Sequence, residues 1–251
     1  AVAREAAKSH TAALTGDEKV WEAVFRQYGV IPLADADDVT DVARMFGAPK
    51  RTRGSRVGIL STSGGAGIIA ADACDALGLS VPGLSEKMRE EVGRFIPAFG
   101  SSLNPVDMTA QVINDPQGFR NLLALMEESP EIDMILPVLS MITGESGLKM
   151  AMDLAEAFAV GKKPMACCWL IDDEHGREFR EYLSNRGVPV FSSPRRAASG
   201  LARLAQWEQR PGLPPGKPQS GFAPRLTEKS RDLTEADAKV ILASYGVPIT
   251  R

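Results

Sequence analysis

The segment RVGILSTSGGAG, residues 56–67, constrains the fold of this chain more than any other part of it. It begins with an apolar run typical of a β-strand, turns through small residues, and continues as the helical pattern IIAADACDALG. A strand that ends at glycines and restarts as a helix points free backbone N–H groups out of the turn, at the positive end of the helix dipole. The pattern therefore predicts a strand–turn–helix unit that binds an anion such as phosphate. The candidate residues are Ser63, Gly64, Gly65, Ala66 and Gly67. The alternative is that the glycines serve close packing alone.

Strand and helix patterns alternate through the rest of the chain. Strands are predicted at 79–81, 134–139, 164–171 and 188–191, and helices at 86–95, 116–128, 148–160, 177–186 and 196–207. The run 134–139 is almost wholly apolar, which indicates burial on both faces of a parallel sheet. We therefore predict an α/β fold with a doubly wound, flavodoxin-like parallel sheet and helices on both faces. Since such sheets bind ligands at the carboxyl ends of their strands, the glycine turn and the loop NPVD, residues 104–107, should share one edge.

The two ends of the chain carry further elements. A helix should run to Tyr28 and end at Gly29, followed by a short strand over Val30–Leu33. Asp35 should cap a second helix with Val39, Val42, Ala43 and Phe46 facing inward. Residues 209–229 are rich in proline and glycine and read as a linker, and residues 234–245 predict a final helix.

Composition excludes several classes of function. The formal net charge of −3 provides no basic field for nucleic acid, and no run approaches the length of a membrane span. The chain begins with neither methionine nor a signal-peptide pattern, so we expect it to start inside a larger, cytoplasmic protein. The three cysteines, Cys74, Cys167 and Cys168, have no metal-ligand spacing and are expected to be reduced core residues.

Three motifs in one order carry a family resemblance: SHTAAL at 9–14, STSGGAG at 61–67 and NPVDMT at 104–109. Together they resemble the nucleoside-diphosphate-forming acyl-CoA synthetases, relatives of succinyl-CoA synthetase. The tail LTEADAKVILASYGVPIT is similar to the start of that family's ATP-grasp module. Each motif is weak alone, but the ordered set covers nearly the whole chain. The resemblance implies that residues 1–10 end a preceding CoA-ligase domain, 11–208 form a flavodoxin-like CoA-ligase domain, 209–229 a linker, and 230–251 the start of an ATP-grasp domain.

By the same resemblance, His10 is the histidine that carries a phosphoryl group between the nucleotide site and the acyl/CoA site. Imidazole is a nucleophile at neutral pH, and helix N-termini supply fixed donors for the charge of a phosphohistidine. One such helix follows the glycine turn, and a second would come from the preceding domain. Asn104 and Asp107 either orient backbone at this edge or contact phosphate through the asparagine amide; the alternative is ordinary turn chemistry.

The resemblance implies an acid–thiol ligase that converts acyl-CoA, ADP and phosphate reversibly to carboxylate, CoA and ATP. Its cofactors would be CoA, ATP or ADP, and Mg²⁺, with none held tightly by this chain and no turnover by this chain alone. The expected partners are the CoA-binding and ATP-grasp domains of the same protein and a small carboxylic acid. Exposed docking faces could also produce a homo-oligomer.

Two other functions remain open. The chain could be a non-catalytic module that senses acyl-CoA or nucleotide in a fusion with a protein acetyltransferase. A dinucleotide-binding domain fits less well, because STSGGAG is not a full G-x-G-x-x-G and no acidic ribose partner follows about 20 residues later. His175 lies in an acidic helix start, where solvated charges are favoured over a metal site.

Overall fold

The computed structural model describes residues 18–33, 35–52, 54–210, 234–244 and 249. The chain divides into two compact units, residues 1–211 and 212–251. The second unit contains helix α10 (Glu235–Ser244), which begins as predicted after Thr234. The Asp237 N–H donates to Thr234 Oγ1 at 3.2 Å and caps the first turn.

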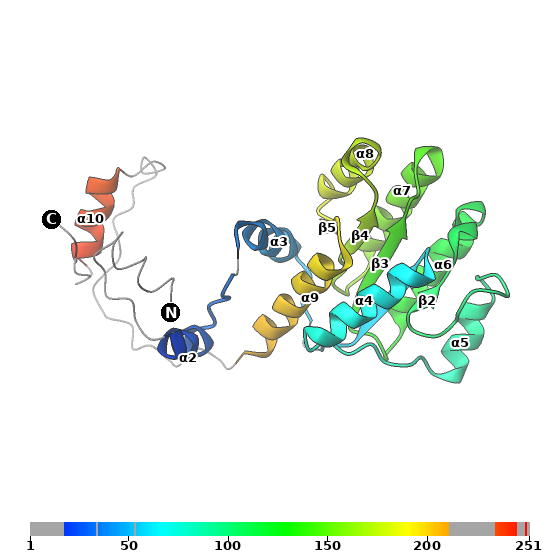
Figure 1. Cartoon of the computed structure of the whole chain (residues 1–251), viewed down its shortest axis with the longest axis horizontal. Coiled ribbons are helices and arrows are strands. Elements are labelled where there is room, and N and C mark those ends of the chain that lie inside the picture. Colours follow the sequence, from blue (N-terminus) through cyan, green and yellow to red (C-terminus); the bar gives the residue numbers. More distant parts are fainter. Residues whose placement is uncertain (1–17, 34, 53, 211–233, 245–248, 250–251) are drawn as a thin grey trace. The chain divides into compact units, whose positions relative to one another are not determined.

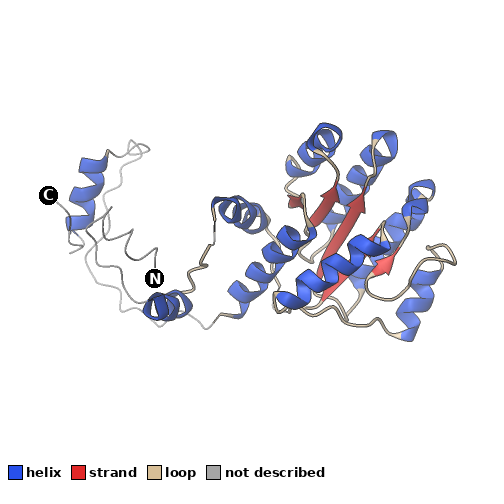
Figure 2. Cartoon of the chain, viewed as in Figure 1, coloured by secondary structure: helices blue, strands red, loops and turns tan. Residues whose placement is uncertain are grey.

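The first unit is built on a five-stranded parallel sheet in the order β2-β1-β3-β4-β5 (Figure 2). The strands are β1 (Val57–Ser61), β2 (Val106–Asp107), β3 (Met134–Ser140), β4 (Cys167–Leu170) and β5 (Val190–Phe191). This order and the parallel pairing confirm the predicted doubly wound, flavodoxin-like sheet, and they place the carboxyl ends of all five strands at one edge.

Helices cover both faces of this sheet (Figure 1). Helix α4 (Gly64–Ala76) packs against α9 (Pro194–Gln209) on one face, and α3 (Ala36–Gly47) packs against α9. The other face carries α5 (Glu86–Gly93), α6 (Pro116–Glu128), α7 (Gly144–Val160) and α8 (Asp173–Ser184). The described part of the first unit also contains a helix α2 (Glu18–Tyr28) and a 3₁₀ turn, η1 (Ala110–Asn114).

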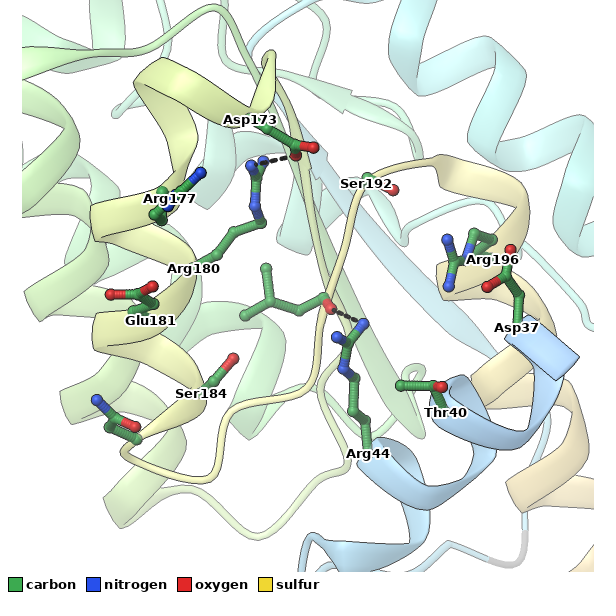
Figure 3. A pocket seen from close by; sticks show the side chains of 12 residues that line it. Asp37, Thr40, Arg44, Asp173, Arg177, Arg180, Glu181, Ser184, Ser192 and Arg196 are labelled. Carbon is green, nitrogen blue, oxygen red and sulfur yellow. Dashed lines mark hydrogen bonds and ion pairs between the residues drawn. The ribbon is translucent and has the colours of Figure 1, made fainter.

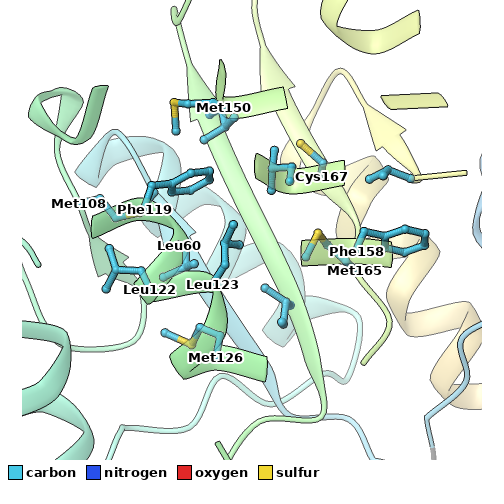
Figure 4. Close-up of a cluster of buried hydrophobic side chains, with 14 of the residues drawn as sticks. Leu60, Met108, Phe119, Leu122, Leu123, Met126, Met150, Phe158, Met165 and Cys167 are labelled. Atoms are coloured by element: carbon cyan, nitrogen blue, oxygen red, sulfur yellow. The ribbon is translucent and has the colours of Figure 1, made fainter. Parts of the chain in front are cut away.

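The core consists of two apolar layers, one on each face of the sheet. Along β1, Leu60 belongs to the layer under α6 and α7 (Figure 4). Its neighbour Ile59 belongs to the layer under α4 and α9. Residues 134–139 of β3 are all buried, which confirms the burial on both faces that the apolar run predicted.

The three cysteines are free thiols inside this core, as predicted. Burial raises the pKa of the Cys74 and Cys168 thiols to about 12, and it also raises the pKa of Cys167 well above its usual value. None of the described helices combines the length and the apolar character that crossing a lipid bilayer requires.

Two predicted strands were wrong, and one strand was missed. Residues 30–33 are irregular, and the segment 79–81 makes only a single bridge, between Ser80 and Arg56. Conversely, the NPVD loop contains strand β2, whose two residues pair with Leu60 and Ser61 of β1. A two-residue strand carries no periodicity, so only its neighbour in the sheet defines it.

The buried face of α3 also differs from the prediction. Val39 is 55% exposed, whereas Asp41 and Met45 are buried. The reason is electrostatic: Arg196 of α9 forms two hydrogen bonds with the Asp41 carboxylate, at 2.6 and 2.8 Å. A second pair, Arg203 with Asp38 at 2.9 Å, lies on the same face. These ion pairs turn the acidic side of the helix toward the domain.

At the amino edge, an ion pair links the starts of β1 and β3. The Asp133 carboxylate accepts hydrogen bonds from the Arg56 backbone N–H at 3.0 Å and from its guanidinium at 2.7 and 2.9 Å. These hydrogen bonds hold the pKa of Asp133 below its usual value. The carboxylate therefore stabilises the fold above its unfolded-state pKa, and this contribution is lost as the pH falls through the lowered folded-state value.

We predict that Asp133→Asn lowers the free energy of unfolding by about 1 kcal/mol at pH 7, with the difference from wild type shrinking below about pH 4. Urea unfolding at a series of pH values measures this. The exposed Asp75→Asn is the matched control and should change stability little at any pH. A constant difference down to pH 3 would contradict the prediction.

Candidate functional site

The glycine turn joins the carboxyl end of β1 to the N-terminus of α4. Ser63 is the N-cap residue: its hydroxyl accepts from the Ala66 N–H at 3.5 Å, and its carbonyl accepts from the Gly67 N–H at 3.0 Å. The N–H groups of Gly64 and Gly65 have no acceptor within the described residues. The helix therefore begins with two backbone donors that remain free to bind a ligand.

The five predicted anion-binding residues divide into an open and a closed part. Gly65 is exposed, and a β-carbon added to it would meet no atom within 4 Å. Ala66 and Gly67 are buried, and a β-carbon at Gly67 would lie 3.3 Å from Cβ of Pro105. Close packing therefore explains the last glycine, whereas the open face of the turn lies at Gly65.

Hydroxyl groups hold the turn in place. The Ser61 hydroxyl donates to the Ser63 carbonyl at 2.7 Å and accepts from the Ser63 N–H at 3.1 Å. Thr62 connects the turn to β3: its N–H donates to Val138 O at 3.1 Å, and its Oγ1 accepts from the Ser140 N–H at 2.9 Å. The two glycine donors thus project from a fixed backbone, so that binding an anion needs little reorganisation.

Asn104 takes the first of its two expected roles and orients backbone. Its Nδ2 donates to Val57 O at 2.8 Å and to Pro82 O at 3.0 Å, and its Oδ1 accepts from the Ile59 N–H at 2.9 Å. Both amide donors are thus engaged within the protein. The Asn104 side chain thus continues the hydrogen bonding of the sheet beside β1. The peptide bond between Asn104 and Pro105 is cis.

Asp107 lies against the glycine turn. Its Oδ1 accepts from the Thr109 N–H at 3.0 Å, and a β-carbon at Gly64 would lie 2.9 Å from its Oδ2. The carboxylate is thus close to the first turn of α4, where the helix dipole favours negative charge. The carboxylate narrows the space through which a ligand could reach the turn on the Gly64 side, whereas the Gly65 side stays open.

The remaining candidate residues are not part of this turn. His10 lies outside the described residues. His175 is at the start of α8, where Asp172 accepts from its backbone N–H at 3.0 Å and approaches its Nδ1 at 2.9 Å. Asp172 raises the pKa of His175 through this side-chain hydrogen bond. Across the described ranges, no three His, Cys, Asp or Glu side chains converge as a metal site would require.

The sequence analysis missed one concentration of charge, which lies beside the edge strand of the sheet. Four arginines line a cavity beside β5, which we name the arginine cavity (Figure 3). They are Arg44 of α3, Arg177 and Arg180 of α8, and Arg196 of α9. Because they come from three separated elements, no local sequence pattern unites them.

Two family models match the chain. Residues 57–209 match the ligase-CoA domain, and residues 1–46 match the succinyl-CoA ligase like flavodoxin domain. The two matches divide the chain between residues 46 and 57, whereas the sequence analysis placed the first boundary after residue 10.

Several characterised proteins are similar in sequence. The ADP-forming acetate–CoA ligase I of Archaeoglobus fulgidus is 30% identical over 205 residues, which are 82% of this chain and 28% of that protein. The ADP-forming 4-hydroxybutyrate–CoA ligase of Nitrosopumilus maritimus is 29% identical over 260 residues, covering 98% of this chain and 36% of that protein.

Solved structures agree on the fold. PH0766 from Pyrococcus horikoshii OT3 superimposes with a TM-score of 0.71 at 28% identity, over 79% of this chain and 46% of that one. The dinucleotide-forming acetyl-coenzyme A synthetase 1 of Ca. Korarchaeum cryptofilum, solved with phosphate and ADP, superimposes with a TM-score of 0.73 at 22% identity, over 82% and 44%.

The sheet order and the helices on both faces define a doubly wound α/β domain whose carboxyl edge carries the glycine turn. With the match over residues 57–209, the chain belongs to the nucleoside-diphosphate-forming acyl-CoA synthetase family. It spans 28% to 45% of the length of the acetate–CoA ligases from Archaeoglobus fulgidus and Pyrococcus furiosus that it resembles.

We predict that Asn104→Ala lowers the free energy of unfolding by about 2–4 kcal/mol, because it leaves two carbonyls and one N–H of the sheet region without partners. Chemical denaturation of the 251-residue chain measures the loss. The neighbouring Leu103→Ala is the control, since Leu103 is 55% exposed and should tolerate truncation. Equal stability of the two variants would show that the Asn104 amide is not structural.

Proposed function

We propose that this chain is the phosphoryl-transferring part of an ADP-forming acyl-CoA synthetase. The observation that carries the proposal is the open pair of N–H donors at Gly64 and Gly65, at the start of α4 in the ligase-CoA domain. The relatives named above are ADP-forming acyl-CoA ligases, which supports the same overall reaction here. That reaction converts acyl-CoA, ADP and phosphate to carboxylate, CoA and ATP.

His10 would carry the phosphoryl group in two balanced steps. First, an imidazole nitrogen attacks the phosphorus of an acyl phosphate, the P–O bond to the acyl group breaks, and the carboxylate leaves with that electron pair. Second, a terminal oxygen of ADP attacks the phosphorus of phosphohistidine, the P–N bond breaks, and ATP and neutral imidazole result. The reverse sequence forms acyl phosphate from ATP and the carboxylic acid.

The residues of the glycine turn would bind the phosphoryl group of phosphohistidine. The N–H groups of Gly64 and Gly65 would donate to its oxygens, and the α4 dipole would add a favourable field. Ser63 and Thr62 would keep these donors in place through the hydrogen bonds described above. Since the Asp107 carboxylate repels a phosphate on the Gly64 side, we expect the group to approach over Gly65.

The other components would act outside this turn. The resemblance assigns CoA to a domain that precedes this chain, and nucleotide with Mg²⁺ to an ATP-grasp module that follows it. The substrate class is a small carboxylic acid.

The proposal predicts that the full-length protein takes up phosphate from labelled ATP on His10. Mass spectrometry under non-acidic conditions should locate the phosphate, and His10→Ala should abolish both the labelling and acyl-CoA formation. His175→Ala is a matched control because His175 is the only other histidine and forms part of a helix start. Acid-labile phosphate on the His10→Ala variant would overturn the mechanism. Labelling of His10 without acyl-CoA formation would favour the sensing alternative.

A second variant tests the glycine turn itself. We expect Gly65→Ala to fold normally, because a β-carbon there meets nothing within 4 Å and alanine favours helix. The added methyl group would project where the phosphoryl group should approach, so transfer through His10 should slow by about tenfold or more. Gly93→Ala, at the end of α5 and also free of neighbours, is the control. Single-turnover phosphorylation kinetics measure both, and equal rates would exclude the turn as the phosphoryl site.

A further inference from the structure

The arginine cavity has the size of a ligand site. Its volume is about 580 Å³, within the usual range for small-molecule pockets. It extends along the edge strand β5, from Asp173 and Ser192 at the carboxyl ends of β4 and β5 to Ser184 and Asn185 at the end of α8. It is distinct from the glycine turn, because β1 and β5 are three strand spacings apart, about 14 Å.

Two of its four arginines are committed to carboxylates. Arg196 pairs with the buried Asp41 through two hydrogen bonds, at 2.6 and 2.8 Å. Arg180 pairs with Asp173 at 2.7 Å and also reaches backbone carbonyls at 3.4 Å (Figure 3). These two guanidinium groups form part of the walls, and most of their charge is compensated within the protein.

The other two arginines keep most of their donors unused. Arg177 has no hydrogen bond or ion pair with any part of the chain that the structure describes. Arg44 makes one long hydrogen bond to Val190 O at 3.5 Å and lies 3.7 Å from an Asp41 oxygen. One guanidinium comes from α3 and the other from α8, so the two line the same cavity from different walls (Figure 3).

The charges around the cavity limit what it can hold. Two guanidinium groups with open donors match the two charges and the fork geometry of a phosphate group. Asp37 and Glu181 also line the cavity, and their carboxylates would repel a longer polyphosphate. The hydroxyl groups of Thr40 and Ser192 add neutral donors. This balance of charges favours the binding of one compact dianion over the binding of a nucleoside triphosphate.

We propose that the arginine cavity binds a single phosphate group, as inorganic phosphate or as a phosphomonoester, between Arg44 and Arg177. This site is separate from the phosphohistidine mechanism and does not depend on it. Because α3 and α8 contribute one arginine each, the bound dianion connects the two helices across the edge of the sheet.

Calorimetric titration of the 251-residue chain tests the site, with inorganic phosphate and phenyl phosphate as probes at constant ionic strength. We expect saturable binding that Arg177→Gln and Arg44→Gln each weaken by about tenfold or more. Arg177→Gln is the more decisive variant, because Arg177 has no described contact on which folding depends. Arg195→Gln is the matched control: it removes the same charge from an exposed position beside Arg196 that does not line the cavity.

Gly65→Ala separates this site from the glycine turn, because it alters only the latter. Binding that survives Gly65→Ala and Arg195→Gln but weakens in Arg177→Gln supports the proposal. Tighter binding of phenyl phosphate would indicate a phosphomonoester as ligand, and tighter binding of inorganic phosphate would indicate the free anion. The proposal is overturned if neither probe binds at millimolar concentration, if Arg177→Gln binds like wild type, or if Arg195→Gln weakens binding equally.

Discussion

The carboxyl end of β1 is fixed from both sides, and the glycine turn depends on that. On one side Ser61 O accepts from the Met108 N–H at 2.8 Å, just after β2. On the other side Thr62 is bonded to Val138 and Ser140 of β3, at 3.1 and 2.9 Å. A glycine-rich segment is intrinsically mobile, since glycine restricts the backbone least. These bonds remove that freedom just before the helix begins, so the Gly64 and Gly65 donors keep a defined direction without side chains of their own.

Much of the fold could be predicted from the sequence because its central elements are long and buried. The apolar run of β3 and the strand–glycine–helix pattern of β1 and α4 each carry a strong local signal. The wrong predictions concern elements whose structure is decided by tertiary contacts. Strand β2 is two residues long and exists because β1 lies beside it. The predicted strand over Val30–Leu33 finds no partner, and the buried face of α3 follows two arginines of α9 rather than its own apolar residues.

The candidate site, too, could be predicted from the sequence only in part. The glycine turn is continuous in sequence, so its residues could be named in advance, but which glycines stay open depends on Pro105 and Asp107. The sequence placed Asn104 correctly at the sheet beside β1. Its hydrogen-bond partners, however, are 22 to 47 residues away in the sequence, and only the folded sheet identifies them. The arginine cavity could not be predicted from the sequence, because its four arginines are up to 152 positions apart and none of them belongs to a motif.

The boundary between the two matched family models is not a structural boundary. Helix α3 lies within the segment matched by the flavodoxin model, whereas α9 lies within the ligase-CoA match. Yet the Asp41 carboxylate of α3 is only 4% exposed and depends on Arg196 of α9 for its compensation. Separating the helices would break both hydrogen bonds of this half-buried pair, and a hydrogen bond to a charged group contributes about 1.5–3 kcal/mol. The two matched segments therefore form one compact unit, and the arginine cavity exists only where they meet.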